Sequence, residues 1–408
     1  MIIFRKHILN NGLTLLLHQD SASPFVVYNT LYKVGARNES ADSTGLAHFF
    51  EHLMFGGSRH APDYDAALYK ASGDNNAFTS SDLTNYYITL PNNNLETCMW
   101  LESDRMANLN LTKKSIAVQR KVVIEEFKEG YINQPYGDAM HLLFDLCYEK
   151  HPYKYPVIGK ELAHIEHVTK SILKDFYKKY YAPNNAIVTI GGNFDFDKTI
   201  ALVEKYYNDI PPTELNAWWS EEPKHDAKKT CYHPANVPTK AIYKAWNCCA
   251  RLDTNYYAMD LITDILGNGK SSRLYQNLVL EQHIFSEIDC YHNGSVDAGV
   301  LIIEAKLNPT IEFDIAEKAI DNVLKTLTQE GLQQNELQRY INKSEVQIEL
   351  NKMQLLNRII DLSFFEMLGD ANAINLETQK YAHVNEQQII HYANEIFVDT
   401  NASVVYYG

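Results

Sequence analysis

The stretch that decides the fold is GLAHFFEHLMFGG, residues 45–57. Its apolar residues recur with the spacing of a helix that buries one stripe. These residues are Leu46, Phe49, Phe50, Leu53 and Met54. Gly56 and Gly57 then give a stop signal. The pattern predicts a short helix on which His48, Glu51 and His52 share one face.

That shared face has a chemical use. Two imidazoles one helical turn apart, about 6 Å along the axis, can bind one tetrahedral zinc ion from the same side, and a carboxylate between them can hold a water molecule. The order His-x-x-Glu-His is the inverse of the commoner His-Glu-x-x-His. The alternative is a structural helix whose histidines are incidental, and a third ligand elsewhere in the chain would decide between the two.

The composition is typical of a soluble globular protein. The chain has 408 residues, of which 45% are apolar and 22% charged, and this length suits two domains of roughly 200 residues. Its 37 basic and 51 acidic residues give a net charge of −14. That balance argues against a nucleic acid or an anionic membrane as partner.

Cysteine spacing and the first residues bear on the compartment. The six cysteines show no Cys-x-x-Cys spacing, which favours buried free thiols. The first residues, MIIFRKH, carry charges where a signal peptide has its apolar core, and no apolar run reaches transmembrane length. We therefore expect a cytoplasmic protein, or a periplasmic one if a signal peptide has been removed.

A candidate third ligand lies on a second helical pattern, residues 112–131. Gln119, Val122, Val123 and Glu126 fall on one face of it at i, i+3, i+4 and i+7, so the Glu126 carboxylate can point inward beside apolar neighbours. A lone glutamate on a helix is usually solvated. A site with two histidines and a water molecule nevertheless needs a third protein ligand.

The second half of the chain repeats the first. Residues 257–269 align with the motif helix. Asp260, Thr263 and Asp264 then stand at the positions of His48, Glu51 and His52, in that order. Residues 338–345 align with 119–126 in the same way. This pattern is typical of a duplicated unit whose second copy has lost its metal ligands.

The duplication and the composition give the predicted domains. The polar, proline-bearing segment 211–229 is the best linker candidate. We predict a zinc-binding catalytic domain at 1–210, this linker at 211–229, and a homologous domain without metal ligands at 230–408.

At this point the chain resembles a known family, the inverted-motif zinc metallopeptidases that include pitrilysin, insulin-degrading enzyme and the mitochondrial processing peptidase. The resemblance covers essentially the whole chain. Its most specific parts are HFFEH at 48–52 and QRKVVIEE at 119–126. The segments NAFT at 76–79, HPY at 151–153, PVIG at 156–159 and YAPNNA at 181–186 also look like the short bacterial members.

The resemblance implies roles for the motif residues. His48 and His52 would be zinc ligands and Glu51 the general base of an endopeptidase that binds one zinc ion per chain. The third ligand would be Glu126 rather than Glu125, which points about 100° away from that face of the helix. Glu129, one turn further on, is a second choice.

The resemblance also implies a fold and a class of substrate. The fold would be two similar α+β domains, each a mixed sheet with helices packed on one face. Two such chains would enclose a chamber that limits substrates to peptides or unfolded segments. The peptide would add as a strand to the edge formed by Asn76, Ala77, Phe78 and Thr79.

Two departures from the family pattern bear on activity. Gln119 stands where the family usually has a glutamate that orients a metal ligand without itself binding the metal, so it can orient a neighbour but adds no charge. Val279 and Ser286 stand where the family has an arginine and a tyrosine that bind substrate and the developing oxyanion.

We therefore expect a heterodimer in which a homologous partner without the zinc motif supplies the arginine and the tyrosine. Two alternatives stay open. One is a peptidase active alone or as a homodimer that uses Arg273 or Tyr291 instead. The other is a catalytically idle homologue that serves in assembly or peptide binding.

Overall fold

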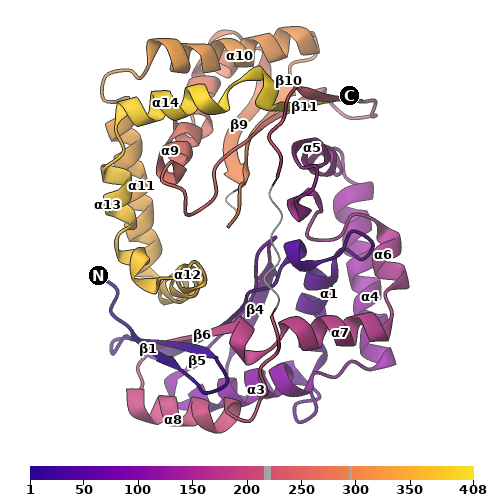
Figure 1. Cartoon of the computed structure of the whole chain (residues 1–408), viewed down its shortest axis with the longest axis vertical. Helices are drawn as coiled ribbons and strands as arrows, with labels where there is room; N and C mark the ends of the chain where they lie inside the picture. Colours follow the sequence, from indigo (N-terminus) through magenta and orange to yellow (C-terminus); the bar gives the residue numbers. More distant parts are fainter. Residues whose placement is uncertain (216–221, 294–295) are drawn as a thin grey trace. The chain divides into compact units, whose positions relative to one another are not determined.

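The computed structural model describes residues 1–215, 222–293 and 296–408 (Figure 1). By its internal contacts the chain divides into two compact units. Unit 1 comprises Met1–Lys128, Tyr155–Trp219 and Glu349–Leu376, and unit 2 comprises Glu129–Lys154, Ser220–Ile348 and Glu377–Gly408. Residues 216–221 of the predicted linker lie outside the described residues.

The core of unit 1 is a six-stranded mixed sheet in the order β1-β2-β6-β3-β5-β4. Its strands are β1 Arg5–Ile8, β2 Thr14–Gln19, β3 Phe25–Tyr32, β4 Asp74–Thr79, β5 Thr84–Pro91 and β6 Ala186–Gly192. β2 and β6 run parallel, whereas the other neighbours run antiparallel. β4 forms one edge of this sheet.

Helices cover both faces of the unit 1 sheet. They are α1 Leu46–Leu53, α2 Tyr64–Lys70, α3 Leu95–Asn108, α4 Lys113–Phe127, α6 Leu162–His167, α7 Lys170–Tyr180, α8 Phe196–Tyr207 and α12 Leu355–Met367. Neighbouring residues of β3 contact opposite layers, as the pleat of a strand requires. Thr30 Oγ1 donates to Glu102 of α3 at 3.0 Å, and Asn29 Nδ2 donates to Ser363 Oγ of α12 at 2.8 Å.

Unit 2 is built on a five-stranded sheet in the order β7-β11-β8-β10-β9. Its strands are β7 Lys229–His233, β8 Ala241–Asn247, β9 Phe285–Asn293, β10 Val300–Leu307 and β11 Ala402–Tyr407. Its helices are α5 Ala139–Cys147, α9 Tyr256–Gly267, α10 Phe313–Glu330, α13 Glu377–Ala382 and α14 Glu386–Ile396. One face shares a core with α9, α10 and α14, and the other with α5. Helix α11, Glu336–Met353, runs from unit 2 into unit 1.

The two sheets have the same topology. The order β2-β6-β3-β5-β4 in unit 1 corresponds to β7-β11-β8-β10-β9 in unit 2. In each set only the first pair is parallel. Helices α1 and α9 occupy the same place in the chain order, and each contacts the edge strand of its sheet, β4 or β9. This arrangement agrees with the duplication that the sequence indicates.

The predicted fold class, two similar α+β domains with mixed sheets, is confirmed. The structure adds one helix to the face of each sheet that the prediction left uncovered. Helix α12 covers this face in unit 1 and α5 in unit 2. Each of these helices comes from the half of the chain that forms most of the other unit, so the compact units are not the contiguous ranges 1–210 and 230–408.

Polar contacts hold the segment around α5 to unit 2. Tyr136 Oη donates to the carbonyl of Thr239 at 2.6 Å. The ring Nε2 of His151 lies 3.1 Å from Asp297 Oδ2. The HPY segment noted in the sequence therefore binds the chain after α5 to the connection that precedes β10. Among the described residues, no helix is both long enough and apolar enough to cross a membrane.

Candidate metal centre

Helix α1 forms because one side of it is buried in unit 1. Its buried residues are Leu46, Ala47, Phe49, Phe50 and Leu53. The ring of Phe50 stacks on Phe176 of α7, with centroids 5.5 Å apart. This packing leaves His48, Glu51 and His52 on the opposite, partly exposed side.

Helix α4 is fixed at its start and at its middle. Thr112 and Ser115 form a capping box at its start, which satisfies the first N–H groups. Arg120 donates to the carbonyls of Ile165 and Val168, at 3.1 and 2.6 Å. Glu126 lies in the last turn of this anchored helix.

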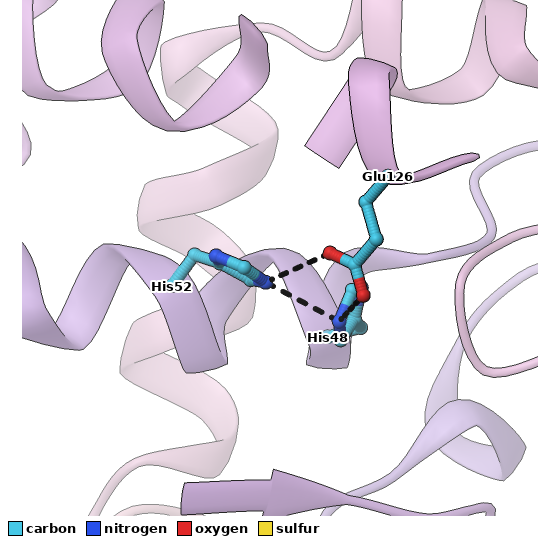
Figure 2. Close-up of side chains that lie close together, drawn as sticks. All are labelled: His48, His52 and Glu126. Atoms are coloured by element: carbon cyan, nitrogen blue, oxygen red, sulfur yellow. Dashed lines mark hydrogen bonds and ion pairs between the residues drawn. The ribbon is translucent and has the colours of Figure 1, made fainter. Parts of the chain in front are cut away.

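The two histidines and Glu126 converge on one point (Figure 2). The Nε2 atoms of His48 and His52 lie 3.3 Å apart. The carboxylate of Glu126 lies 3.6 Å from His48 Nε2 and 3.3 Å from His52 Nε2. When the histidine, cysteine, aspartate and glutamate side chains of the described residues are compared, these three form the group that lies close enough together to hold a metal ion.

These distances fit zinc. Bonds of about 2.0–2.1 Å at tetrahedral angles place neighbouring ligand atoms about 3.3–3.4 Å apart. The two Nε2 atoms are at this spacing, and the Glu126 carboxylate reaches each of them through a different oxygen, Oε1 towards His48 and Oε2 towards His52. The three side chains can therefore offer one face of a tetrahedron and leave the fourth position for water or substrate, as in the catalytic His₂Glu sites. Burial lowers the pKa of His48 to about 4, and His52 acts in the same direction. His48 is therefore neutral near pH 7, the form that binds a metal.

Glu51 has a specific partner on the edge strand. Thr79 Oγ1, at the end of β4, donates to Glu51 Oε2 at 2.6 Å. Burial raises the pKa of Glu51, while this hydrogen bond and His52 lower it. A carboxylate with such opposed influences, held beside a metal site, is placed to act as a general base. The sequence put Thr79 only among the substrate-binding residues and gave no sign of this contact.

The other acidic candidates, Glu125 and Glu129, are not part of this cluster. Glu125 pairs with Lys128 at 2.9 Å, and its side chain is 71% exposed. Glu129 lies beyond the end of α4, in the π-helical turn η4 Lys128–Ile132. Within the described residues, His48 Nδ1 is buried without a hydrogen-bond partner, so Gln119 does not orient that ring.

The predicted peptide-binding residues lie on the free edge of the sheet. β4 pairs with β5 alone among the described strands. Along it Asn76 and Phe78 are exposed, and Ala77 and Thr79 are partly buried on the other face. The side-chain oxygen of Asn76 accepts a hydrogen bond from the Ala77 N–H at 2.8 Å. An incoming strand would compete with this local bond.

Arg273 and Tyr291, considered as substitutes for the missing arginine and tyrosine, differ in whether the side chain is available to bind a substrate. Arg273 donates to both carboxylate oxygens of Glu336, at 2.9 and 2.6 Å, and to the carbonyl of Gly331. Its side chain is only 8% exposed, so Arg273 is committed to the structure of unit 2. Tyr291 is exposed on β9, where its hydroxyl donates to Glu304 at 3.2 Å.

One further residue near this centre was not singled out in the sequence. Glu39 accepts hydrogen bonds from the first N–H groups of α1. The sequence contains one indication that a residue outside the helix caps it: Gly45 precedes the motif helix and has no side chain with which to cap it.

The fold and the site together define a class of protein. An α+β unit whose helix carries His-x-x-Glu-His, with a second glutamate converging from another helix, is the arrangement of an inverted-motif zinc metallopeptidase.

Comparison with family models identifies the family. The model described as Insulinase (Peptidase family M16) matches residues 15–160, and the model described as Peptidase M16 inactive domain matches residues 167–344. The chain belongs to peptidase family M16. The second match agrees with the loss of the metal ligands from the repeated motif.

Individual relatives support this assignment. The zinc protease PqqE of Helicobacter pylori is 28% identical over 409 residues, which cover 98% of this chain and 91% of that protein. The uncharacterized zinc protease YmxG of Bacillus subtilis is 23% identical over 399 residues, 92% of this chain and 93% of that protein.

Solved structures show the same fold. A protease from Helicobacter pylori matches over the full length of both chains, with a TM-score of 0.94 and 26% identity. Pitrilysin matches with a TM-score of 0.77 and 18% identity, over all of this chain and 45% of pitrilysin. At that identity the likeness to pitrilysin concerns the fold alone.

Proposed function

We propose that this chain is a zinc-dependent endopeptidase or oligopeptidase that cleaves peptides and unfolded segments. One observation carries the proposal. The Nε2 atoms of His48 and His52 lie at the spacing of a tetrahedral zinc site, with one oxygen of the Glu126 carboxylate facing each of them, and Glu51 lies on the same helix face between the two histidines. The neutral state of His48 supports the same assignment.

The roles of the side chains follow from their positions. His48, His52 and Glu126 would hold one zinc ion, which when bound polarises a scissile carbonyl and makes water more acidic. Glu51 takes the proton from the attacking water and passes it to the leaving amine. Thr79 holds the Glu51 carboxylate in place while the proton moves.

Substrate binding is proposed for the edge strand. A peptide that pairs with Asn76–Thr79 of β4 makes main-chain hydrogen bonds, which give affinity with little demand on sequence. β4 contacts the motif helix α1, so a peptide on this edge runs beside the metal ligands. An enclosed chamber would restrict access to flexible chains.

A partner chain is proposed to complete the site. Val279 is partly buried against the core of unit 2 and Ser286 is exposed on β9, and neither carries a positive charge or a phenol that could stabilise an oxyanion. Arg273 is tied to Glu336. The arginine and tyrosine are therefore proposed to come from a homologous subunit without the zinc motif. Tyr291 in a homodimer is the alternative.

The test is hydrolysis of a quenched fluorescent peptide by the purified chain with its zinc content verified. The chain is assayed alone and mixed with a homologue from the same genome that has the arginine and tyrosine but no zinc motif. Activity in the mixture alone supports the divided site. Activity of the chain alone overturns the heterodimer and directs attention to Tyr291, and zinc binding without activity in either assay favours an idle peptide-binding homologue.

A further inference from the structure

The metal-binding helix α1 begins without a cap of its own. Its N-cap residue, Gly45, has φ of 84° and makes no side-chain cap hydrogen bond. The first N–H groups of a helix need acceptors from elsewhere, and a helix of eight residues is marginal by itself. His48 lies in this first turn, so its orientation depends on what those N–H groups bind.

Glu39 supplies the missing acceptors from outside the helix. Its Oε2 accepts from the N–H of Gly45 at 2.6 Å, and its Oε1 accepts from the N–H of Ala47 at 2.7 Å. Both distances lie at the short end of the usual N–H···O range, so each oxygen has its own donor. The carboxylate also lies at the positive end of the helix dipole.

The segment that carries Glu39 is itself anchored beside the edge strand. Glu39 directly follows the 3₁₀ turn η1, Ala36–Asn38. The Arg37 N–H donates to the carbonyl of Ser81 at 2.9 Å. Ser81 lies two residues after Thr79, the partner of Glu51. Glu39 thus links the start of the metal-binding helix to the end of the strand proposed to bind substrate.

The placement of this carboxylate opposes its ionisation. Burial raises the pKa of Glu39 to about 8, and the N–H groups of Ala47, Gly45 and Leu46 act in the opposite direction. Burying an acid costs free energy, and the N–H groups around Glu39 offset that cost only in part. The contacts of Glu39 fall on the one turn that orients a metal ligand.

We infer that Glu39 is a positioning residue, whose carboxylate fixes the first turn of α1 so that His48 and His52 direct their Nε2 atoms at one point. This inference rests on the proposed zinc site. It concerns a residue that does not touch the metal or the substrate.

The test is the zinc affinity of the full-length chain, measured by competition with a chromophoric chelator. Glu39→Gln keeps the volume but can accept at only one oxygen, and Glu39→Ala removes both acceptors. Glu96→Gln is the matched control, because Glu96 is exposed and pairs with Lys205 on the surface of unit 1. We expect zinc binding to weaken about 10- to 100-fold in Glu39→Gln, the usual cost of removing a group that orients a metal ligand without binding the metal, and to stay unchanged in Glu96→Gln.

Two further measurements separate positioning from general stability. The urea midpoint of metal-free Glu39→Gln is expected to match that of Glu96→Gln, and its kcat on the quenched peptide is expected to fall while KM holds. Wild-type zinc affinity in Glu39→Gln would overturn the inference, and so would a loss of affinity that merely follows a lower urea midpoint. If Glu39→Ala does not fold, Glu39→Gln decides the question.

The proposed function fails separately from this inference. If His52→Ala binds zinc as tightly as the wild-type chain, the zinc site itself is wrong. If His52→Ala loses zinc but Glu39→Gln does not, the site stands and only the role of Glu39 is refuted.

Discussion

Replacing Thr79 by valine should slow peptide hydrolysis and leave zinc bound. The hydroxyl of Thr79 donates to Glu51 Oε2 at 2.6 Å, and valine removes this donor while it keeps the β-branched shape that suits a strand. The Glu51 carboxylate then loses the contact that fixes its orientation. The three atoms that would bind zinc lie on other residues, so metal content should not change.

The size of the effect follows from the contact. A hydrogen bond to a charged group contributes about 1.5–3 kcal/mol. If all of it is lost in the transition state, kcat falls by about 10- to 150-fold. KM should change less, because the substrate is proposed to bind through the main chain of β4.

The assay is hydrolysis of the quenched peptide under the conditions in which the wild-type chain is active, together with metal analysis of each variant. Thr79→Ser is the control, because it keeps the hydroxyl and should retain most of the activity. A kcat for Thr79→Val equal to that of wild type would refute the role of Thr79. A loss shared equally by Thr79→Ser would assign the effect to the strand and not to the hydroxyl.

Three other predictions address the base, the metal and the second unit. Glu51→Gln should keep zinc and abolish cleavage, because an amide cannot take a proton from water. Metal analysis and the peptide assay check this, and retained turnover would refute the role of Glu51 as general base. Removal of zinc by a chelator should lower the unfolding temperature of the wild-type chain but not of His52→Ala; calorimetry measures both, and an equal shift would contradict the site. Burial alone would raise the pKa of Glu317, but hydrogen bonds from Lys228 and Lys244 lower it from 4.5 to about 2. The stabilisation of the fold by ionised Glu317 is therefore complete above about pH 4.5, and up to about 3 kcal/mol of it is lost as the pH falls towards 2. In urea unfolding, Glu317→Gln should be less stable than wild type at pH 7 and should lose less stability on acidification. Parallel pH profiles of the two proteins would contradict this role of Glu317.

The metal cluster could be predicted because helical phase is a local property of sequence. Residues four apart lie on one face of a helix and adjacent residues lie about 100° apart. The family resemblance pointed to Glu126 and not Glu125, and helical phase agrees with that choice; in the structure Glu126 lies 3.3 Å from His52 Nε2 while Glu125 pairs with Lys128. The same periodicity revealed the repeated motif in the second half of the chain.

The exchange of helices between the two units could not be predicted in this way. An apolar stripe shows that a helix will be buried but does not say against which sheet. Helix α5 lies in sequence between elements of unit 1 and packs on the sheet of unit 2, and α12 does the reverse. Because the duplicated sheets offer similar apolar faces, the choice is made by long-range contacts such as that of Asn29 with Ser363.

The two contacts that orient the site were also beyond a sequence pattern. Glu39 caps a helix that begins seven residues further on, across a loop, whereas the usual capping rules look within four residues of the helix start. Thr79 reaches Glu51 from a strand that follows it by 28 positions. Both contacts depend on how the elements pack. The candidate metal ligands could therefore be predicted from the sequence, whereas the contacts of Glu39 and Thr79 could not.

The repeated motif shows why the same fold does not give a second site. Helix α9 and strand β9 keep the arrangement of α1 and β4, but the side chains have other commitments. The two carboxylate oxygens of Asp260 bind His292 at 2.7 Å and Tyr381 at 2.6 Å. Thr263, at the position of the general base, donates its hydroxyl to the carbonyl of Asp260 at 2.7 Å and cannot act as a base. A histidine placed at position 260 would therefore still lie beside His292 and Tyr381, which could bind it in place of a metal ion. In the second copy the fold is preserved, but the contacts of these side chains leave no metal ligands.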